Sequence, residues 1–155
     1  MAWWEEIGLG IKVHRPISII PQTVLTPGTE YYTIAGGLVL ITGLVGLFTT
    51  VPGGAVNATW CHNPTLGTDT DLCIATALNG AAEGDVMSVS GIAGAGMLPL
   101  GGSVAQLMGG VAGSCKGLVL DAGALGVFTD ASVGGNWRWV LWYMPITPGA
   151  TVVAA

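Results

Sequence analysis

The side chains with the most obvious chemical potential lie between residues 61 and 73. Cys61 and His62 are adjacent, Cys73 follows later, and Asp69 and Asp71 stand between them. Thiolates, imidazoles and carboxylates all bind zinc, but the common zinc patterns use two pairs of ligands, each pair about two to four residues apart. This spacing does not match them, so we expect no metal site. The two cysteines are interpreted as small buried thiols, and a Cys61–Cys73 disulfide stays open if their strands are neighbours.

The remaining ionisable residues do not form a recognisable catalytic set. Asp69 and Asp71 alone could suggest calcium or glycosidase chemistry, but Glu83 and Asp85 belong to another turn, and a solvated turn is the better interpretation. The sequence contains neither a Gly-x-Ser-x-Gly motif nor a phosphate loop ending in Gly-Lys-Ser/Thr. The 155 residues include only 9 acidic residues, 4 basic residues and 2 histidines, so an active site would have to use a large share of the ionisable residues. We therefore predict no catalytic residue and no cofactor, and expect a protein that is not an enzyme.

The composition points instead to a protein that buries much of its surface. Charged residues make up 8% of the chain, against roughly 25% in an average soluble domain, while hydrophobic residues reach 51%. Such a chain either enters a membrane or hides its surface in an assembly. The net charge is −5, and the few basic residues are not clustered, so nucleic-acid binding is not expected.

One apolar run makes the membrane alternative worth testing. Leu38–Val51 contains no charged residue, but its apolar core is about 14 residues long, short of the roughly 20 that a spanning helix needs. Glycines and threonines interrupt it, and no Lys or Arg flanks it. We expect strands here and no membrane partner. The first residues, Met-Ala-Trp-Trp-Glu-Glu, also lack the features of a signal peptide, so synthesis and folding are expected in a cytosol.

Short apolar runs separated by glycine and proline turns indicate an all-β fold. They predict an antiparallel β-sandwich or barrel formed by residues 31–155. The expected strands are Tyr31–Ala35, Leu38–Thr42, Val45–Val51, Asn57–Cys61, Asp71–Leu78, Asp85–Gly91, Lys116–Leu120, Leu125–Thr129 and Asn136–Met144.

Residues 1–30 are interpreted as an extended N-terminal arm. Three prolines prevent a long helix, and Trp3 and Trp4 are too apolar for a solvated tail. Two alternatives remain open. The arm either packs on a neighbouring subunit or returns to its own domain as an extra strand.

The last long strand carries the second group of candidate contact residues. Trp137 and Trp139 share one face of it, and Arg138 and Trp142 share the other. Such a strand is either central in a closed core or contributes one face to a subunit interface, where Trp and Arg are enriched. The predicted protein-interface residues are Trp3, Trp4, Trp137, Arg138, Trp139 and Trp142.

Parts of the sequence resemble small virion structural proteins of tailed bacteriophages. The similarity lies in residues 31–47, Asn63-Pro64-Thr65, Asp71-Leu72-Cys73, and the ending from Trp139 to Pro145 and from Pro148 to Ala155. Some of these proteins are head decoration, or cement, proteins. The resemblance implies a homotrimer that binds the major capsid protein lattice on the outer capsid surface of the virion after synthesis in the host cytoplasm. The alternatives are a virion fibre or receptor-binding module that recognises a host surface, and a small membrane protein.

Overall fold

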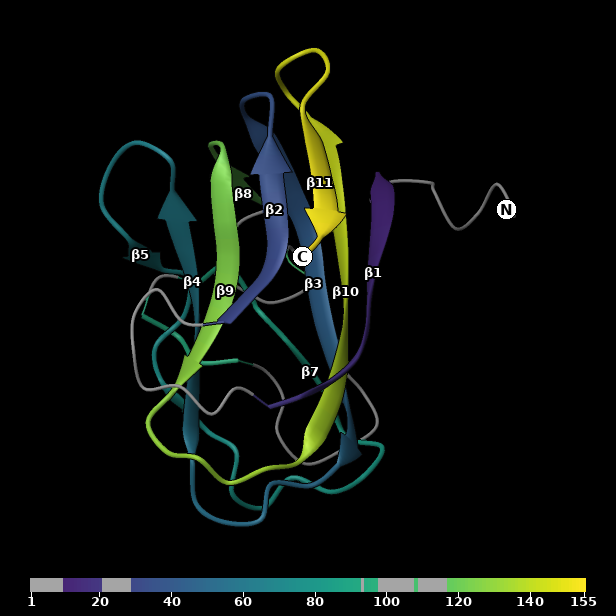
Figure 1. Cartoon of the computed structure of the whole chain (residues 1–155), viewed down its shortest axis with the longest axis vertical. Coiled ribbons are helices and arrows are strands. Elements are labelled where there is room, and N and C mark those ends of the chain that lie inside the picture. The colour runs from purple at the N-terminus through teal and green to yellow at the C-terminus, as the bar shows by residue number, and fades with distance from the viewer. Residues whose placement is uncertain (1–9, 21–28, 93, 98–107, 109–116) are drawn as a thin grey trace.

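The computed structural model describes residues 10–20, 29–92, 94–97, 108 and 117–155. Within these ranges every regular element is a β-strand, and all strand pairs are antiparallel. The strands form two sheets packed face to face, which confirms the predicted all-β fold as a sandwich (Figure 1).

The two sheets share the strands almost equally. Sheet A has the order β1 (Ile11–Ile19), β10 (Asn136–Pro145), β3 (Val39–Thr50) and β7 (Val86–Ser88), with β8 (Leu118–Leu120) also paired to β3. Sheet B has the order β11 (Thr151–Ala154), β2 (Thr29–Ala35), β9 (Gly123–Thr129), β4 (Asn57–Pro64) and β5 (Thr70–Asp71), with β6 (Thr76–Ala77) also paired to β4.

Long strands that follow one another in sequence mostly lie in opposite sheets. The chain passes from β2 in sheet B to β3 in sheet A through Gly36 and Gly37, whose φ angles are 81° and 120°. These left-handed conformations favour glycine. A Cβ at Gly37 would also lie 2.7 Å from the Thr147 hydroxyl oxygen. The glycine pair therefore allows the abrupt crossing that stacks the two sheets.

The apolar run at residues 38–51 forms the central strand of sheet A. β3 joins two strands that were predicted separately, and in the described part of the chain no helix is long and apolar enough to cross a membrane. The predicted break between Thr42 and Val45 is absent, because β3 continues through it. Gly46, which lies inside the second predicted strand, has a packing role. A Cβ at Gly46 would lie 2.7 Å from the indole ring of Trp139 on the adjacent strand.

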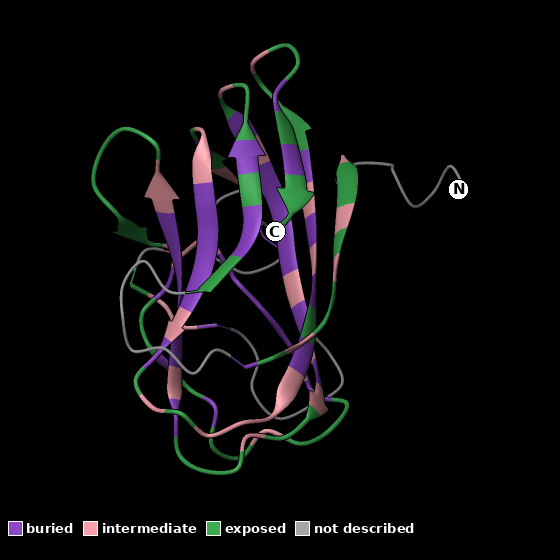
Figure 2. Cartoon of the chain, viewed as in Figure 1, coloured by how far each residue is buried: buried purple, intermediate pink, exposed green. Residues whose placement is uncertain are grey.

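The core lies between the sheets and is rich in aromatic residues (Figure 2). Its largest side chains come from β2, β3, β4 and β10, and each is at most 1% exposed: Tyr31, Tyr32, Phe48, Trp60, Trp137 and Trp139. The core therefore draws on strands that are distant in sequence, as expected for a sandwich with alternating sheets.

The described part of the N-terminal arm belongs to sheet A. β1 pairs with β10 of the same chain from Ile11 opposite Tyr143 to Ile19 opposite Asn136. For these residues the structure corresponds to the second alternative, an extra strand on its own domain. Arg15 connects this strand to sheet B. Its guanidinium donates a hydrogen bond to the main-chain oxygen of Ala155, which follows β11, and lies 5.1 Å from the ring centroid of Tyr31 in β2.

Other differences from the predicted strands occur at short elements. The expected strand at residues 71–78 is divided into β5 and β6, which both pair with β4. β11 was not predicted. Its Val152 is buried opposite Ile34 of β2, while Val153 is 53% exposed, so four residues form a strand only because β2 offers a partner.

Candidate protein-interaction surfaces

The strand β10 separates the predicted contact residues into two environments. Trp137 and Trp139 point between the sheets and are both 0% exposed, whereas Arg138 is exposed and Trp142 is partly exposed on the opposite face. The burial of Trp137 and Trp139 places them in the core of this chain, away from any surface that a partner could touch. Only Arg138 and Trp142 of the four residues on this strand remain available for contact.

Trp137 and Trp139 belong to a network of aromatic rings. Trp139 lies edge-on to Trp60 with ring centroids 4.8 Å apart, and edge-on to Trp137 at 5.4 Å. The Trp137 indole N–H donates a hydrogen bond of 2.5 Å to the Tyr31 hydroxyl. Edge-to-face geometry is favourable for aromatic pairs and ties sheet A to sheet B. Through this network, Trp137 and Trp139 of β10 contact side chains of both sheets.

The outer face of sheet A is an apolar surface with a shallow groove. Val140 on β10 lies opposite Val45 on β3, and the neighbouring pair is Arg138 and Leu47. Paired residues in antiparallel strands place their side chains on the same face. These four residues, together with His14 of β1, Gly46 and Val86 of β7, line a hollow of about 380 Å³.

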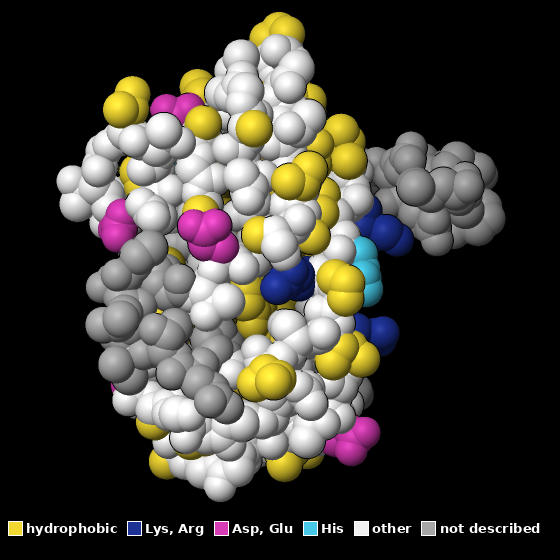
Figure 3. Space-filling model, viewed as in Figure 1, with side chains coloured by type: hydrophobic (Ala, Val, Ile, Leu, Met, Phe, Trp, Pro, Cys, Tyr) yellow, Lys and Arg dark blue, Asp and Glu magenta, His cyan; other side chains and the backbone are white. Residues whose placement is uncertain are grey.

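The charges of the two sheets differ in sign. Within the described ranges, every basic residue lies in a strand of sheet A, namely Lys12, Arg15 and Arg138, and none of the strands of this sheet carries an acid. The strands of sheet B contain Glu30 and Asp71 and no basic residue. Figure 3 shows basic and histidine side chains gathered at the edge of the molecule where β1 lies.

The register of β1 brings two basic side chains beside the groove. Lys12 lies opposite Trp142, and His14 lies opposite Val140, so both share the outer face with Arg138. No residue in the described part of the chain forms an ion pair with Lys12 or Arg138. The groove is therefore an apolar hollow with cationic margins, which suits a ligand that combines an apolar side chain with a carboxylate.

β1 adds exposed aliphatic side chains to the same face. Ile17 and Ile19 are 61% and 62% exposed, and they flank Ser18, whose hydroxyl bonds inward to the Tyr31 hydroxyl at 3.4 Å. Trp3 and Trp4, the other two predicted contact residues, lie outside the described residues.

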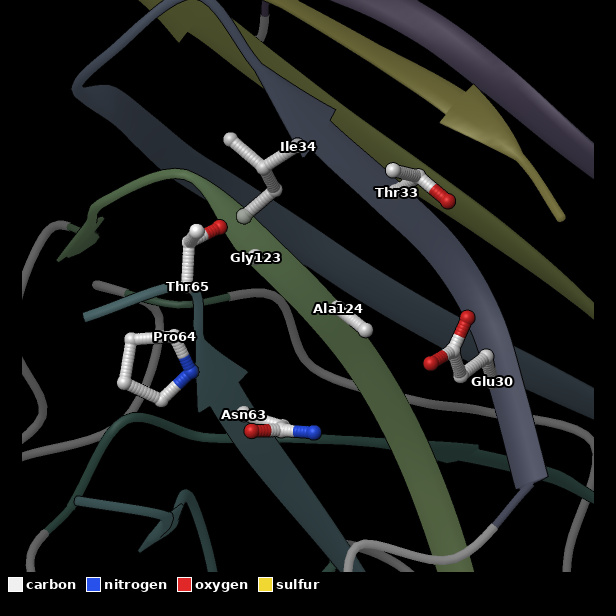
Figure 4. A pocket seen from close by; sticks show the side chains of 8 residues that line it. All are labelled: Glu30, Thr33, Ile34, Asn63, Pro64, Thr65, Gly123 and Ala124. Carbon is white, nitrogen blue, oxygen red and sulfur yellow. The ribbon is translucent and has the colours of Figure 1, made fainter. Parts of the chain in front are cut away.

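A second hollow lies on the outer face of sheet B and has a polar lining. The small residues Gly123 and Ala124 on β9 leave space between side chains of β2 and β4, as Figure 4 shows. Glu30, Thr33 and Asn63 surround this space of about 280 Å³. Sequence analysis did not identify it, because the small residues only form a floor once β2 and β4 lie on either side of β9.

The cysteines and the nearby acids do not assemble into a metal centre in the described part of the chain, where no group of three or more His, Cys, Asp or Glu side chains gathers. The side chains of Cys61 and Cys73 are both buried, and the main-chain N–H of Trp60 contacts the Cys73 sulfur at 3.4 Å. Burial raises the pKa of each thiol to about 11, which makes both unreactive at neutral pH.

His62 and the two acids between the cysteines have separate surroundings. His62 is buried, and its Nε2 lies 3.0 Å from the main-chain oxygen of Asp121. Asp69 and Asp71 are both exposed, Asp69 directly before the two-residue strand β5 and Asp71 at its end. The residues that first suggested chemistry thus contribute to packing and to a solvated turn.

A comparison of the chain with protein-family models, curated proteins and solved structures finds no significant match.

Proposed function

We propose that this chain is a structural, non-enzymatic virion protein that decorates and stabilises a phage capsid by binding the major capsid protein lattice, as a homotrimer on the outer capsid surface. The observation that carries the proposal is the outer face of sheet A. Trp142 lies there, partly exposed, beside aliphatic side chains and the cations Lys12 and Arg138. Aromatic and Arg side chains in such a setting are typical anchors of protein interfaces.

The rest of the molecule is consistent with a scaffold for that face. The aromatic core holds β10 rigidly from behind, so Arg138 and Trp142 are presented on a fixed strand. Rigid presentation lowers the entropy that is lost on binding. Over a lattice, many copies of one modest contact give a high total avidity.

The test is binding to empty, expanded phage heads. We expect purified protein to bind heads with saturation, and Trp142→Ala to weaken binding while leaving the thermal midpoint nearly unchanged. Thr33→Ala, on the outer face of sheet B, is the matched surface control and should bind as the unchanged protein does. Absence of saturable binding by the unchanged protein would refute the proposal.

Trp139→Ala separates the core residues from the contact residues. Because the Trp139 side chain is fully buried, its removal should lower the free energy of unfolding by about 3–5 kcal/mol. Trp142→Ala should cost much less, because that side chain is partly exposed. Equal losses of stability in the two variants would contradict the division of β10 into a core face and a contact face.

A second candidate function, a fibre or receptor-binding module for a host surface, is favoured by the polar hollow on sheet B. Glu30, Thr33 and Asn63 offer hydrogen-bonding groups of the kind that bind sugar hydroxyls. Binding to host cells rather than to heads, lost in Asn63→Ala and retained in Trp142→Ala, would favour this function over capsid decoration.

A further inference from the structure

We infer that the groove on the outer face of sheet A binds residues 3–6 of a second copy of this chain. The inference rests on the proposed function in that it names the contact by which the copies of a decorating protein would join. It concerns contacts between copies alone, so it is tested in solution without capsids.

The chemistry of the groove matches that of one segment of the chain. The groove is complementary to a ligand with a large apolar group and nearby carboxylates. Val45, Leu47 and Val140 line its apolar part, and Arg138 and His14 also contribute to its lining. The segment Trp3-Trp4-Glu5-Glu6 places two indoles directly before two carboxylates, and residues 1–9 contain no basic residue.

The expected pairings follow from size and charge. The aliphatic hollow of about 380 Å³ has room for an indole of Trp3 or Trp4. Glu5 and Glu6 would then approach Arg138 and Lys12, which have no ion-pair partner among the described residues. A guanidinium can bind a carboxylate through two parallel hydrogen bonds, which adds direction to the attraction.

The path of β1 favours a neighbouring copy over the same chain. The chain enters β1 at Ile11, opposite Tyr143, which is three residues before His14 and the level of the groove. At about 3.4 Å per residue this is roughly 10 Å away along the strand. To reach its own groove, the preceding segment would have to reverse over β1, whereas a neighbour placed beyond that end of the sheet needs no reversal.

The contact joins two different surfaces, the arm of one copy and the groove of the next. Such a head-to-tail contact generates a closed ring when the rotation that relates each copy to the next adds up to a full turn. A ring of three copies would give the homotrimer of the proposed function, with each groove occupied once.

The decisive experiment compares the mass of the native protein in solution with that of charge-reversed variants. The unchanged protein should form an oligomer. Glu5→Lys with Glu6→Lys should raise its dissociation constant about 10- to 100-fold for each lost charge pair. Arg138→Glu should do the same, and combining Arg138→Glu with the two arm substitutions should restore much of the affinity. Glu30→Lys, on sheet B, is the control and should leave the mass unchanged.

Two further variants test the apolar part of the contact. Trp3→Ala with Trp4→Ala should produce monomers that keep the thermal midpoint, because every core side chain of the described residues is left in place. Deletion of residues 1–9 should give a monomer that binds an added peptide of residues 1–10. A monomeric unchanged protein, or an oligomer that persists after the deletion, would overturn the inference. Loss of head binding with an intact oligomer would instead contradict only the capsid proposal.

Discussion

Two adjacent tyrosines provide a sensitive test of how the core is held together. Tyr31 and Tyr32 both lie in β2 and are both 0% exposed, but their hydroxyl groups have opposite surroundings. The Tyr31 hydroxyl accepts the 2.5 Å hydrogen bond from the Trp137 indole and contacts the hydroxyl of Ser18 at 3.4 Å. Within the described part of the chain, the Tyr32 hydroxyl is buried without a partner. The same substitution, Tyr→Phe, should therefore have opposite effects at the two positions.

The magnitudes follow from what each substitution leaves behind. Tyr31→Phe leaves the fully buried N–H of Trp137 without an acceptor, which costs about 1–3 kcal/mol. Tyr32→Phe removes a buried hydroxyl that forms no hydrogen bond with the described residues, so the free energy of unfolding should rise by about 1 kcal/mol. Neither substitution leaves a large cavity, because Phe keeps the ring.

The assay is urea unfolding of the two variants and the unchanged protein, followed by tryptophan fluorescence and circular dichroism. Similar m-values would show that midpoint shifts reflect stability. Tyr31→Phe should unfold at lower urea than the unchanged protein and Tyr32→Phe at equal or higher urea. If Tyr31→Phe proved at least as stable as Tyr32→Phe, the hydrogen-bond network derived from the core would be wrong.

The packing and the buried thiols give two further predictions. Gly46→Ala should destabilise the protein by about 1–3 kcal/mol, because its Cβ would lie 2.7 Å from the Trp139 ring. Gly54→Ala should cost little, because its Cβ would meet its nearest neighbour at 3.4 Å. Thermal unfolding of both variants measures the difference. Stability should also fall as the pH rises from 9 towards 11, since the folded chain holds the protons of Cys61 and Cys73 with pKa values of about 11 while the unfolded thiols ionise near 9. The free energy of unfolding should fall by up to about 1.4 kcal/mol per pH unit for each thiol. The measurement is urea unfolding at pH 8 and pH 10 under reducing conditions, and equal midpoints at the two pH values would contradict the prediction.

Sequence patterns predicted the strands well where turns and alternation were both clear. The predicted strands at residues 31–35, 125–129 and 136–144 correspond to β2, β9 and β10 within a few residues. The prediction was less accurate where glycine has a packing role. Gly43 was taken as part of a break between two strands, but it lies inside β3. Gly46 was placed within a predicted strand, but its role in making room for the Trp139 indole of β10 was not predicted.

The candidate surface was only partly visible in the sequence. Alternation correctly grouped Trp137 with Trp139 and Arg138 with Trp142, but it gave no means to decide which group faces the other sheet. The aliphatic groove residues of β3 and β7, namely Val45, Leu47 and Val86, were not identified, since these strands are remote in sequence from β10 and meet it only through strand pairing.

The sequence by itself determined the class of fold and the scarcity of ionisable side chains. Frequent glycine turns, β-branched residues and 8% charged residues already require strands with little ionisable surface. The tertiary structure decided which side chains are core and which are surface. Tyr31 and Tyr32 both point inward because the pairing of β2 with β9 shifts register between Glu30 and Tyr32, which no period-two pattern predicts. Likewise, Lys12 and His14 share the outer face with Arg138 only because β1 pairs with β10. Such contacts depend on strand order and register, which are set by the packing of the whole sandwich rather than by any local segment.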